Sequence, residues 1–561
     1  MIVIIKKRHR RGEDSMFRNA TKAGSLGIAA VLLAMTATAC GNNNEGASPS
    51  ASSTPAVSPS ASTSESASTS PEPAKEPTPI SIYSYDRTDY ANDRVVQEIE
   101  KRTNTKLTIQ PGIPWDPEQL NVMTATGKYP DVITIIDNDT FDRTGQWIKT
   151  GILQPFTDEI LEQTPNLKSL LTQPEFEDLK VDGKYYLLPM RDEPPLGSAG
   201  QFVFQIRQDW LDKLQLPVPT TTDEFLDTLI KFKTMDPDGN GKEDTYGLIT
   251  NGLDKLVSYS AGFFGLPHDE RSTGFLKVGD GYEYWAIQPQ VKDTLRWVKQ
   301  LYDSGLIHPD TLTQTNITKT RPVFAEGRIG VTVENMNFDQ LVNRITALQA
   351  NVPDASVIQM SALKGTEGAY GYSKGNGHWA YTALSSQNKN PLESAKLLDF
   401  LLSDEGTKLS TVGIEGVHYT MDGDKLVWNE EEKKKDPGFN VNTSGQFHEL
   451  NWGIVRWSPM VSEFYMKASE TVVPNYSQMV QENLDRVNKY LIEPASYNTS
   501  NEEWSKFIGT GKTLENEFFI KAVMGKVDID KGFDSFVKSW KAAGGAEAMK
   551  AMSDAIAASK G

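Results

Sequence analysis

The most informative part of this sequence reads Asp236-Pro-Asp-Gly-Asn-Gly-Lys-Glu-Asp244. Carboxylate and amide side chains fall at alternate positions, and two glycines between them allow the chain to turn. Ca²⁺ prefers oxygen ligands, and an EF-hand loop supplies them at alternate positions from the first to the ninth. The twelfth position, which carries a bidentate Glu in an EF-hand, is Gly247 here. The spacing therefore predicts a structural Ca²⁺ site of modest affinity, with an ordinary Asp- and Gly-rich surface turn as the alternative. The predicted ligands are Asp236, Asp238, Asn240, the Lys242 carbonyl and Asp244.

Segments on both sides of this loop resemble those of a known family. Arg207-Gln-Asp-Trp-Leu-Asp-Lys-Leu214 and Thr220-Thr-Thr-Asp-Glu-Phe225 precede it, and Asp244-Thr-Tyr-Gly-Leu248 follows it. In this order they resemble the lipoprotein branch of the family 1 extracellular solute-binding proteins, which serve sugar importers of Gram-positive bacteria. Algin-binding members of that family hold calcium in a loop of this kind, so the resemblance also supports the metal prediction. Further similar segments are residues 127–132, 182–189, 324–333 and 413–419.

The N-terminus has the features of a secretory signal. Basic residues precede a short apolar run, Leu26–Met35, which is followed by small residues and then by Cys40. Such a run is too short to span a membrane, and the order of the three parts is typical of a signal peptide. Cys40 is the only cysteine of the chain, so it has no partner for an intramolecular disulfide. We expect residues 1–39 to be the signal and Cys40 to be lipidated, with an ordinary secretory signal and an incidental cysteine as the alternative. A start at Met16 is an alternative to Met1.

The segment after the cysteine is expected to be a linker. Residues 40–79 are rich in Ser, Ala, Pro and Thr and carry almost no large apolar side chain. Such a composition cannot bury enough apolar surface to offset the entropy of ordering, so we expect disorder. The whole chain has a formal net charge of −17. This acidity argues against nucleic acid as a partner and against a membrane contact made by basic residues.

From residue 80 onwards, strand-like and helix-like segments alternate. Ile80–Tyr85, Lys106–Ile109 and Asp131–Ile136 are strand-like, with helical spacing between them around Val95–Ile99 and Asp116–Thr126. This alternation is typical of α/β folds with doubly wound parallel sheets. Together with the resemblance, it predicts a two-lobed periplasmic-binding-protein-like fold, each lobe a doubly wound sheet, joined by a hinge. The predicted lobe 1 comprises residues 80–195 with 355–412, and the predicted lobe 2 comprises residues 196–354 with 413–561.

Local signals also predict individual helices. Thr221 and Glu224 have the spacing of a capping box, which opens a helix through Lys233. Asn390 and the proline after it open a second helix through Leu402. The Ala-rich stretch 533–558 is predicted to be helical.

Candidate ligand-binding residues follow from the strands. Ligands of doubly wound sheets bind beyond the carboxyl ends of the strands. Asp137 follows the strand predicted at 131–136. Glu334 and Asn335 follow segment 324–333, and the resemblance implies that this strand ends at the ligand cleft.

Four further candidates come from aromatic residues and from family-like segments. Sugar sites combine polar groups with aromatic faces. Trp379 and Trp452 lie near Gly-, Asn- or Ser-rich turns, although packing in the core is the alternative for each. Arg191 follows one segment that resembles the family, and Glu415 lies within another. The predicted ligand-binding residues are therefore Asp137, Arg191, Glu334, Asn335, Trp379, Glu415 and Trp452.

Two motifs suggest an enzyme but lack the context that each requires. Gly371-Tyr-Ser-Lys-Gly375 matches the nucleophile elbow of α/β-hydrolases, yet no strong strand precedes it and no helical pattern follows it. Gly509-Thr-Gly-Lys-Thr513 imitates the end of a phosphate-binding loop without the first glycine or a preceding strand. We therefore expect no catalytic residues and no enzymatic activity.

These observations lead to one functional prediction with two alternatives. The chain is predicted to be a monomeric, lipid-anchored solute-binding protein on the outer face of the cell membrane. It is expected to capture a carbohydrate, specifically an oligosaccharide, for an ABC importer whose permeases and ATPase are separate chains. The alternatives are a secreted glycan-active hydrolase and a peptide-binding protein of the same fold.

Overall fold

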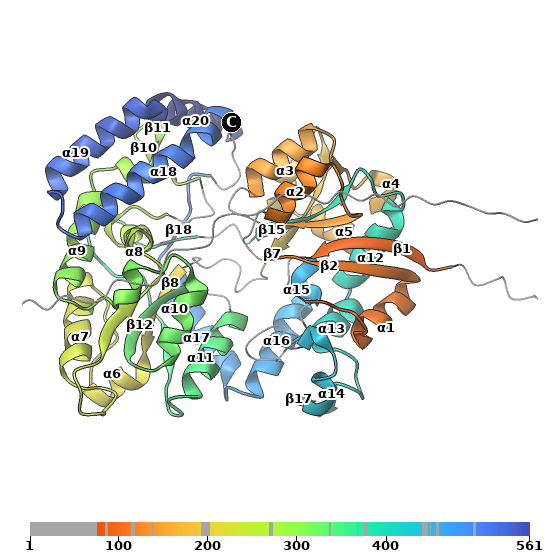
Figure 1. Ribbon diagram of the computed structural model, residues 1–561, viewed down its shortest axis with the longest axis horizontal. Coiled ribbons are helices and arrows are strands. Elements are labelled where there is room, and N and C mark those ends of the chain that lie inside the picture. The colour runs from red at the N-terminus through yellow and green to blue at the C-terminus, as the bar shows by residue number, and fades with distance from the viewer. Residues whose placement is uncertain are drawn as a thin grey trace, which may run out of the picture. The chain divides into compact units, whose positions relative to one another are not determined.

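The computed structural model describes most of the chain beyond residue 75 (Figure 1). The described ranges are 76–84, 88–113, 118–136, 140–191, 202–268, 273–335, 338–366, 368–374, 378–439, 447–448, 450–455, 459–496 and 501–560. Within these ranges, no helix is long and apolar enough to cross a membrane. Cys40, Asp137 and nearly all of the predicted linker lie outside them.

The first sheet is mixed, with a parallel half and an antiparallel half. β1 (Thr78–Ser84) pairs in parallel with β2 (Thr105–Pro111) and with β3 (Val132–Ile135). β15 (His378–Ser385) pairs antiparallel with β3, with β4 (Leu153–Gln154) and with β7 (Leu187–Arg191). α1 (Arg94–Thr103) lies between β1 and β2 in the chain, and α2 (Glu118–Thr126) lies between β2 and β3, so the predicted alternation is confirmed. The sheet is not wholly parallel because β15 enters it from a distant part of the chain.

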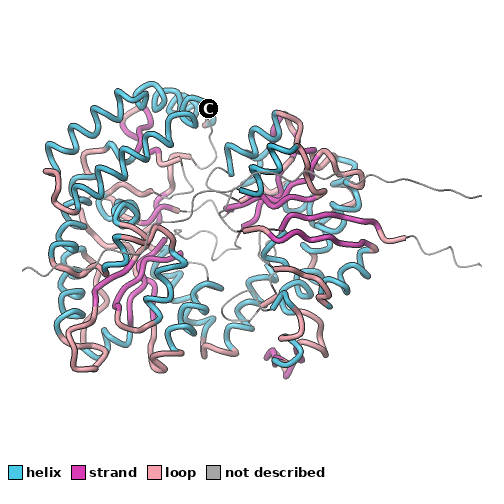
Figure 2. The backbone as a smooth tube through the Cα atoms, in the orientation of Figure 1, coloured by secondary structure: helices cyan, strands magenta, loops and turns pink. Residues whose placement is uncertain are grey.

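The second sheet is also mixed and has the order β13-β8-β12-β9. β12 (Ile329–Asn335) is parallel to β9 (Tyr246–Ile249) and antiparallel to β8 (Phe202–Arg207), which in turn is antiparallel to β13 (Val357–Gln359). Figure 2 shows that helices make up much of the chain around both sheets. The main helices after β3 are α3 (Thr140–Lys149), α4 (Asp158–Leu161), α5 (Pro165–Leu171), α6 (Gln208–Leu214), α7 (Thr222–Thr234), α8 (Leu253–Ser260), α9 (Val291–Asp303), α10 (Ile317–Ala325), α11 (Phe338–Gln349), α12 (Pro391–Leu402), α13 (Asp404–Val412), α14 (Glu430–Lys433), α15 (Leu450–Ile454), α16 (Pro459–Glu470), α17 (Tyr476–Asn488), α18 (Glu502–Val523), α19 (Ile529–Trp540) and α20 (Ala546–Ser559).

Helix α7 shows how local sequence sets an element. The Thr221 side chain accepts from the Glu224 N–H (3.1 Å), and the Glu224 carboxylate accepts from the Thr221 N–H (3.2 Å). This is the predicted capping box, and such a cap is worth about 1 kcal/mol. Phe225, Leu229 and Phe232 lie on its buried face and join the core beside the second sheet. The helix therefore fixes the start of the Asp236–Asp244 loop.

The C-terminal stretch is helical, as predicted, but a π-helical turn, Lys541–Gly545, divides it into two helices. α19 ends at Trp540, and α20 begins at Ala546. Gly544 lies between them with a φ of 109°, a conformation that an L side chain rarely adopts. Glycine at this point lets the chain turn between the two helices, so α20 does not continue the axis of α19.

Contacts within the two cores lead us to propose revised lobe boundaries. Ala355, Val357 and Tyr372 belong to the hydrophobic cluster of the second sheet, although they fall in the segment predicted for lobe 1. Phe439 and Ile454 belong to the cluster of the first sheet, although they fall in the segment predicted for lobe 2. We therefore propose that the chain changes lobe between β7 and β8, between residues 373 and 378, and between α15 and α16.

Candidate functional site

Two of the predicted ligand-binding positions lie at one edge of the first sheet. β3 and β7 both run antiparallel to β15, so their carboxyl ends meet the start of β15. In this register Arg191, the last residue of β7, lies opposite His378, and Trp379 is the next residue of β15. The side chains of Arg191 and Trp379 lie outside the described part of the structure. Their backbone positions fit the edge at which such sheets bind ligands.

Three buried hydroxyl groups hold the helix that carries Trp452 against the same sheet. Gly453 O, in α15, accepts from the hydroxyls of Ser84 (3.3 Å) and Thr134 (3.0 Å). The Thr382 hydroxyl donates to the carbonyl of the following residue of α15. The three donors come from β1, β3 and β15, and each is fully buried. The carbonyls at the end of α15 have no partners within the helix, so these hydroxyls satisfy them and fix the backbone of Trp452 near the centre of the sheet.

Glu334 lies at the end of β12 and is fully buried. Its two carboxylate oxygens accept from Arg321 Nε (3.0 Å) and Nη2 (2.9 Å), and Oε2 also accepts from Arg344 Nη1 (3.4 Å). A buried carboxylate needs such partners, because an unpaired charge in the interior is strongly destabilising. The side chain of Glu334 therefore has a clear role in holding two guanidinium groups at this edge of the second sheet.

Arg344 connects this ion cluster to Asn335. Its Nη2 donates to the Asn335 carbonyl (2.9 Å), and its Nη1 donates to Asn335 Oδ1 (3.4 Å). Its Nε donates to Gln205 Oε1 (3.1 Å), on the neighbouring strand β8. The predicted pair Glu334 and Asn335 is thus brought together with Arg344 and Gln205 in one network at the carboxyl end of β12. Because this network comes from strand register and from α11, the sequence alone did not indicate its arginine members.

Three further residues at this edge were not singled out in the sequence. Phe202 begins β8 and lies opposite Asn335. Its ring stacks on Tyr259 of α8, with ring centroids 4.4 Å apart and 15° between the planes. Asn251 follows β9, which runs parallel to β12, and is 8% exposed. No motif marks these residues, and only the pairing of the strands brings them to the same edge.

Glu415 is exposed and pairs with Lys408 Nζ (2.8 Å) and with the Tyr419 hydroxyl (3.5 Å). None of these partners belongs to the sheet edges described above. Its neighbour in the same family-like segment, His418, is fully buried.

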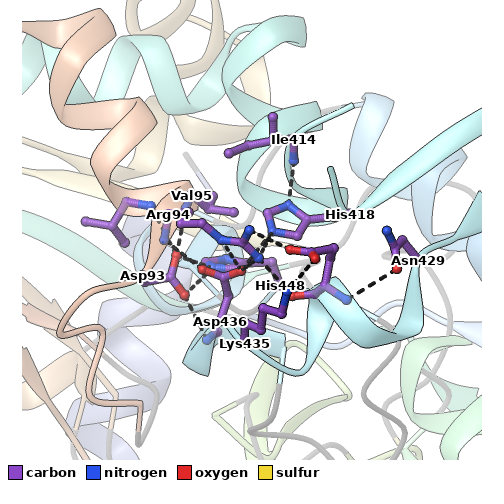
Figure 3. Close-up of polar contacts among 12 residues, drawn as sticks. Asp93, Arg94, Val95, Ile414, His418, Asn429, Lys435, Asp436 and His448 are labelled. Carbon is purple, nitrogen blue, oxygen red and sulfur yellow. Dashed lines mark hydrogen bonds and ion pairs between the residues drawn. The ribbon is translucent and has the colours of Figure 1, made fainter. Parts of the chain in front are cut away.

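His418 is part of a buried ion cluster that ties the chain around residues 414–436 to the start of α1 (Figure 3). His418 Nε2 lies 2.8 Å from Asp436 Oδ2, and its Nδ1 accepts from the Ile414 N–H (2.9 Å). Arg94 donates to Asp436 through Nε (2.9 Å) and to Glu432 through Nη1 (2.7 Å). Burial lowers the pKa of His418, against the opposing effect of Asp436. Because Nδ1 accepts a hydrogen bond, the neutral ring with its proton on Nε2 satisfies the contacts with Ile414 and Asp436.

A second histidine and carboxylate pair lies beside the first (Figure 3). Asp93 caps α1, and both of its oxygens lie about 3 Å from His448 Nε2, at 3.0 and 3.1 Å. The Gly438 N–H also donates to Asp93 (3.0 Å). Burial raises the pKa of Asp93, but His448 and the backbone N–H groups of Gly438 and Val96 outweigh burial and lower it to about 2. The two pairs therefore join the start of α1 to distant parts of the chain.

The described geometry around Ser373 differs from that of a nucleophile elbow. Ser373 is buried in the two-residue strand β14 (Tyr372–Ser373), and the next element in the chain is the strand β15. The elbow requires a turn from a strand into a helix. Both ring nitrogens of His418 are engaged in the ion cluster, so this histidine is not poised to activate a hydroxyl.

The Asp236–Asp244 loop brings its carboxylates around Asn240. Asn240 Nδ2 donates to Asp238 Oδ2 (2.8 Å) and to Asp244 Oδ1 (3.0 Å). Asp236 accepts from the N–H groups of Asn240 (3.1 Å) and Gly241 (2.9 Å). Burial and a hydrogen bond to the Asp236 carboxylate raise the pKa of Asp238, as expected for crowded carboxylates.

This loop has the ligand chemistry of a Ca²⁺ site. The carboxylate and amide oxygens suit a hard cation, and a divalent charge would relieve the crowding. In the described part of the chain, however, no group of three or more His, Cys, Asp or Glu side chains is arranged so as to hold a metal ion. In this structure the carboxylates of Asp238 and Asp244 are held together by hydrogen bonds from the Asn240 amide.

Comparison with known proteins identifies relatives along most of the chain. A family model described as "Bacterial extracellular solute-binding protein" matches residues 94–414, more than half of the sequence. The "Polygalacturonan/rhamnogalacturonan-binding protein YtcQ" of Bacillus subtilis (strain 168) is 26% identical over 489 residues, covering 83% of this chain and 89% of YtcQ. "Lipoprotein LipO" of the same organism is 26% identical over 494 residues, with the same shares of the two chains.

Solved structures share the fold. An alginate-binding protein, AlgQ2, in a structure without calcium ion, has a TM-score of 0.66 and 23% identity, and the match covers 86% of this chain and 98% of AlgQ2. The substrate-binding protein FusA of Streptococcus pneumoniae, in complex with kestose, has a TM-score of 0.64 and 18% identity, covering 86% and 99% of the two chains. Another FusA structure is described as an EF-hand mutant. Both folds have two lobes, so the predicted two-lobed fold is confirmed.

Proposed function

Because the chain belongs to the family of bacterial extracellular solute-binding proteins, we propose that it captures a carbohydrate and delivers it to an ABC importer. The observation that carries this proposal is the similarity to YtcQ along most of both chains. YtcQ is named for binding polygalacturonan and rhamnogalacturonan, both polymers of sugars, so we propose an oligosaccharide as the ligand. The permeases and the ATPase of the importer would be separate chains.

The chemistry of the two sheet edges supports this proposal. Sugar sites combine a few placed polar groups with aromatic faces. At the edge of the second sheet, Asn335 lies opposite Phe202 in the backbone register, and the Phe202 ring stacks on Tyr259. At the edge of the first sheet, Arg191 and Trp379 are neighbours in the backbone register. We propose that both edges contact the sugar.

The test is binding without turnover. A panel of oligogalacturonides, rhamnogalacturonan fragments, fructooligosaccharides and alginate oligosaccharides would be screened by thermal shift and then by calorimetry. A ligand that binds only the native state stabilises it by about 2.7 kcal/mol at a hundredfold excess over Kd. We expect at least one oligosaccharide to raise the melting temperature, and monosaccharides to do so less.

Each alternative function has its own outcome in the same test. Every saccharide that binds would be incubated with the protein for hours and analysed by chromatography. Product formed at catalytic rates would favour the glycan-active hydrolase. Stabilisation by a peptide library in place of saccharides would favour a peptide-binding protein.

We further propose that Cys40 carries a lipid anchor, so that the protein acts on the outer face of the cell membrane. The support is the signal-like N-terminus and the single cysteine. The name of LipO describes that relative as a lipoprotein.

Finally, we propose that the Asp236–Asp244 loop binds Ca²⁺ in a structural role. The support is the crowding of its carboxylates and the EF-hand noted for FusA. The residues that would hold the ion are Asp236, Asp238, Asn240, Asp244 and the Lys242 carbonyl. Amide oxygen and nitrogen are assigned from hydrogen bonds. A cation would favour the Asn240 oxygen at the place where Nδ2 now contacts two carboxylates.

A further inference from the structure

His448 lies just before the helix that carries Trp452, and it is fully buried. Its ring Nδ1 accepts from the N–H of Leu450, the first residue of α15 (3.4 Å). The first N–H groups of a helix have no partner within it, so a side chain that accepts from one of them acts as a cap. The backbone N–H of His448 donates to the Thr411 carbonyl of α13 (2.8 Å), which also ties this end of α15 in place.

Asp93 sets which ring nitrogen of His448 carries the proton (Figure 3). Both carboxylate oxygens of Asp93 lie within hydrogen-bond distance of Nε2, at 3.0 and 3.1 Å. A carboxylate only accepts, so Nε2 is the donor, and Nδ1 of the neutral ring is then the acceptor that Leu450 requires. The Gly438 N–H donates to the same carboxylate (3.0 Å), and a Cβ at Gly438 would collide with His448 Nε2. The ring is therefore confined to this position.

The other end of α15 lies at the first sheet. Its Gly453 carbonyl accepts from the hydroxyls of Ser84 (3.3 Å) and Thr134 (3.0 Å), and Ser84 is the last residue of β1. This is the edge at which such sheets bind ligands. α15 spans only Leu450–Ile454, and so short a helix has little stability of its own. The position of the Trp452 backbone therefore depends on the contacts at both ends of the helix.

We propose that His448 is a positioning residue of the sugar site: held by Asp93, its ring caps α15 and thereby places Trp452 at the edge of the first sheet. This inference rests on the proposed function, because it assigns His448 a part in binding the oligosaccharide. The contacts from Asp93 through the ring to Leu450 form in only one protonation state of the ring. A substitution that removes the acceptor at Nδ1 therefore disturbs Trp452 even when the contact with Asp93 is kept.

Two substitutions of His448 separate the two ring nitrogens. The amide oxygen of Asn lies close to the place of Nδ1 and accepts from the N–H two residues on, as in an Asx turn. Gln reaches instead to the place of Nε2, where its amide donates to Asp93, and leaves no acceptor at Nδ1. The two variants thus keep one contact each.

The experiment measures affinity by calorimetry with trigalacturonate and with kestose. We expect His448→Gln to weaken the saccharide that binds by about fivefold or more, the effect of losing one helix cap. His448→Asn should bind within about twofold of the wild type, although it removes the donor to the buried Asp93 and should lower the melting temperature. Affinity would then follow the acceptor at Nδ1 rather than the melting temperature, which a purely structural role does not predict.

Hydrogen exchange of the α15 amides is a second readout, and it needs no ligand. Exchange reports local opening of a helix, which the loss of a cap makes more frequent. Mass spectrometry should show faster exchange over Leu450–Ile454 in His448→Gln and wild-type exchange in His448→Asn.

His418→Gln is the matched control. His418 is also fully buried, lies 2.8 Å from Asp436 through Nε2, and accepts from the Ile414 N–H through Nδ1 (2.9 Å). Its Nδ1 therefore holds the segment at residue 414 instead of α15. This variant should lower the melting temperature and leave both the affinity and the exchange of α15 unchanged.

Wild-type affinity in a folded His448→Gln variant, or equal losses in the Gln and Asn variants, would overturn the positioning role while leaving the proposed function intact. If His448→Gln does not fold, Asp93→Asn decides, because an amide at that position no longer requires a donor at Nε2. Wild-type affinity in Asp93→Asn would then overturn the positioning role. Failure of the wild-type protein to bind any saccharide of the wider panel would overturn the proposed function, and the positioning role with it.

Discussion

Glu515 is an ionisable side chain held within an aromatic core. It is 5% exposed, and its Oε2 accepts from the Tyr284 hydroxyl (3.0 Å). The Tyr284 ring stacks on Trp540, with centroids 5.7 Å apart. Burial raises the pKa of Glu515 to about 7, against the opposing effects of Lys512 and of the Tyr284 hydrogen bond. The folded protein therefore retains a proton on Glu515 at pH values where the unfolded chain has released it.

This shift predicts a pH-dependent gain in stability for Glu515→Gln. Because the folded pKa is raised, the stability associated with the protonated group is fully present below the unfolded pKa and is lost as pH rises towards about 7. Gln keeps an acceptor for Tyr284 and cannot ionise. We expect the free energy of unfolding at pH 8 to rise by about 1 to 3 kcal/mol, with little change at pH 4.5. Urea titrations at both pH values measure it.

The control for this prediction is Glu502→Gln. Glu502 lies on the same helix, its side chain is 72% exposed, and it pairs with Lys506. It should change stability by less than about 0.5 kcal/mol at either pH. An equal gain for Glu515→Gln at pH 4.5 and pH 8 would show that the effect comes from packing rather than from ionisation.

Helices that a short sequence motif specifies were predicted from the sequence. Strand pairs between distant parts of the chain were not. The capping box of α7 involves Thr221 and Glu224, three residues apart, so the sequence contains the whole motif. The antiparallel entry of β15 depends on pairs such as Thr134 with Thr382, and the edge of the second sheet depends on Phe202 opposite Asn335. No local pattern encodes such pairs, because burial of both sheet faces selects them only when the chain has folded.

The same distinction applies to the candidate site. Glu334 and Asn335 were identified because they end a recognisable strand. Their partners Arg321 and Arg344 were not, since they come from α10 and α11 and meet the strand only in the folded core. The Asp236–Asp244 loop was predicted as a Ca²⁺ site because all of the candidate oxygen ligands lie within one short segment.

The Asp236–Asp244 loop gives a prediction at the scale of one element. Three aspartates within it, Asp236, Asp238 and Asp244, repel one another, and a bound divalent cation would remove that repulsion. We expect chelation to lower the melting temperature by a few degrees, since binding at tenfold excess over Kd stabilises by about 1.4 kcal/mol. Asp238→Ala should abolish the sensitivity to chelator and calcium, as measured by differential scanning calorimetry.

Asp227→Ala is the matched control for the loop. Asp227 is an exposed acid on α7 that pairs with Lys231 (2.6 Å), outside the loop. This variant should keep the response of the wild-type protein to calcium. A melting temperature that ignores both chelator and calcium in the wild type, with no metal found by elemental analysis, would make the loop an ordinary turn.

At the scale of the whole molecule, the net charge bears on the proposed attachment to the cell surface. The chain has a formal net charge of −17, so an anionic lipid surface repels it. No helix among the residues that the structure describes could cross a bilayer. The lipid proposed for Cys40, the only cysteine of the chain, would supply a hold on the membrane that this charge does not. Two acyl chains are enough, because each buried CH₂ contributes about 0.8 kcal/mol.

The proposed anchor predicts where a variant without Cys40 is found. Cys40→Ala removes the acceptor thiol, and the acidic protein should then appear in the culture medium instead of the membrane fraction. Thr38→Ala changes the same segment but keeps the thiol, so it should remain in the membrane fraction. Cell fractionation with mass spectrometry of the mature protein measures both outcomes, since lipidation adds the mass of the acyl groups to the N-terminal cysteine. If Cys40→Ala stays in the membrane fraction with the same mass as the wild type, the attachment does not depend on a lipid at this cysteine.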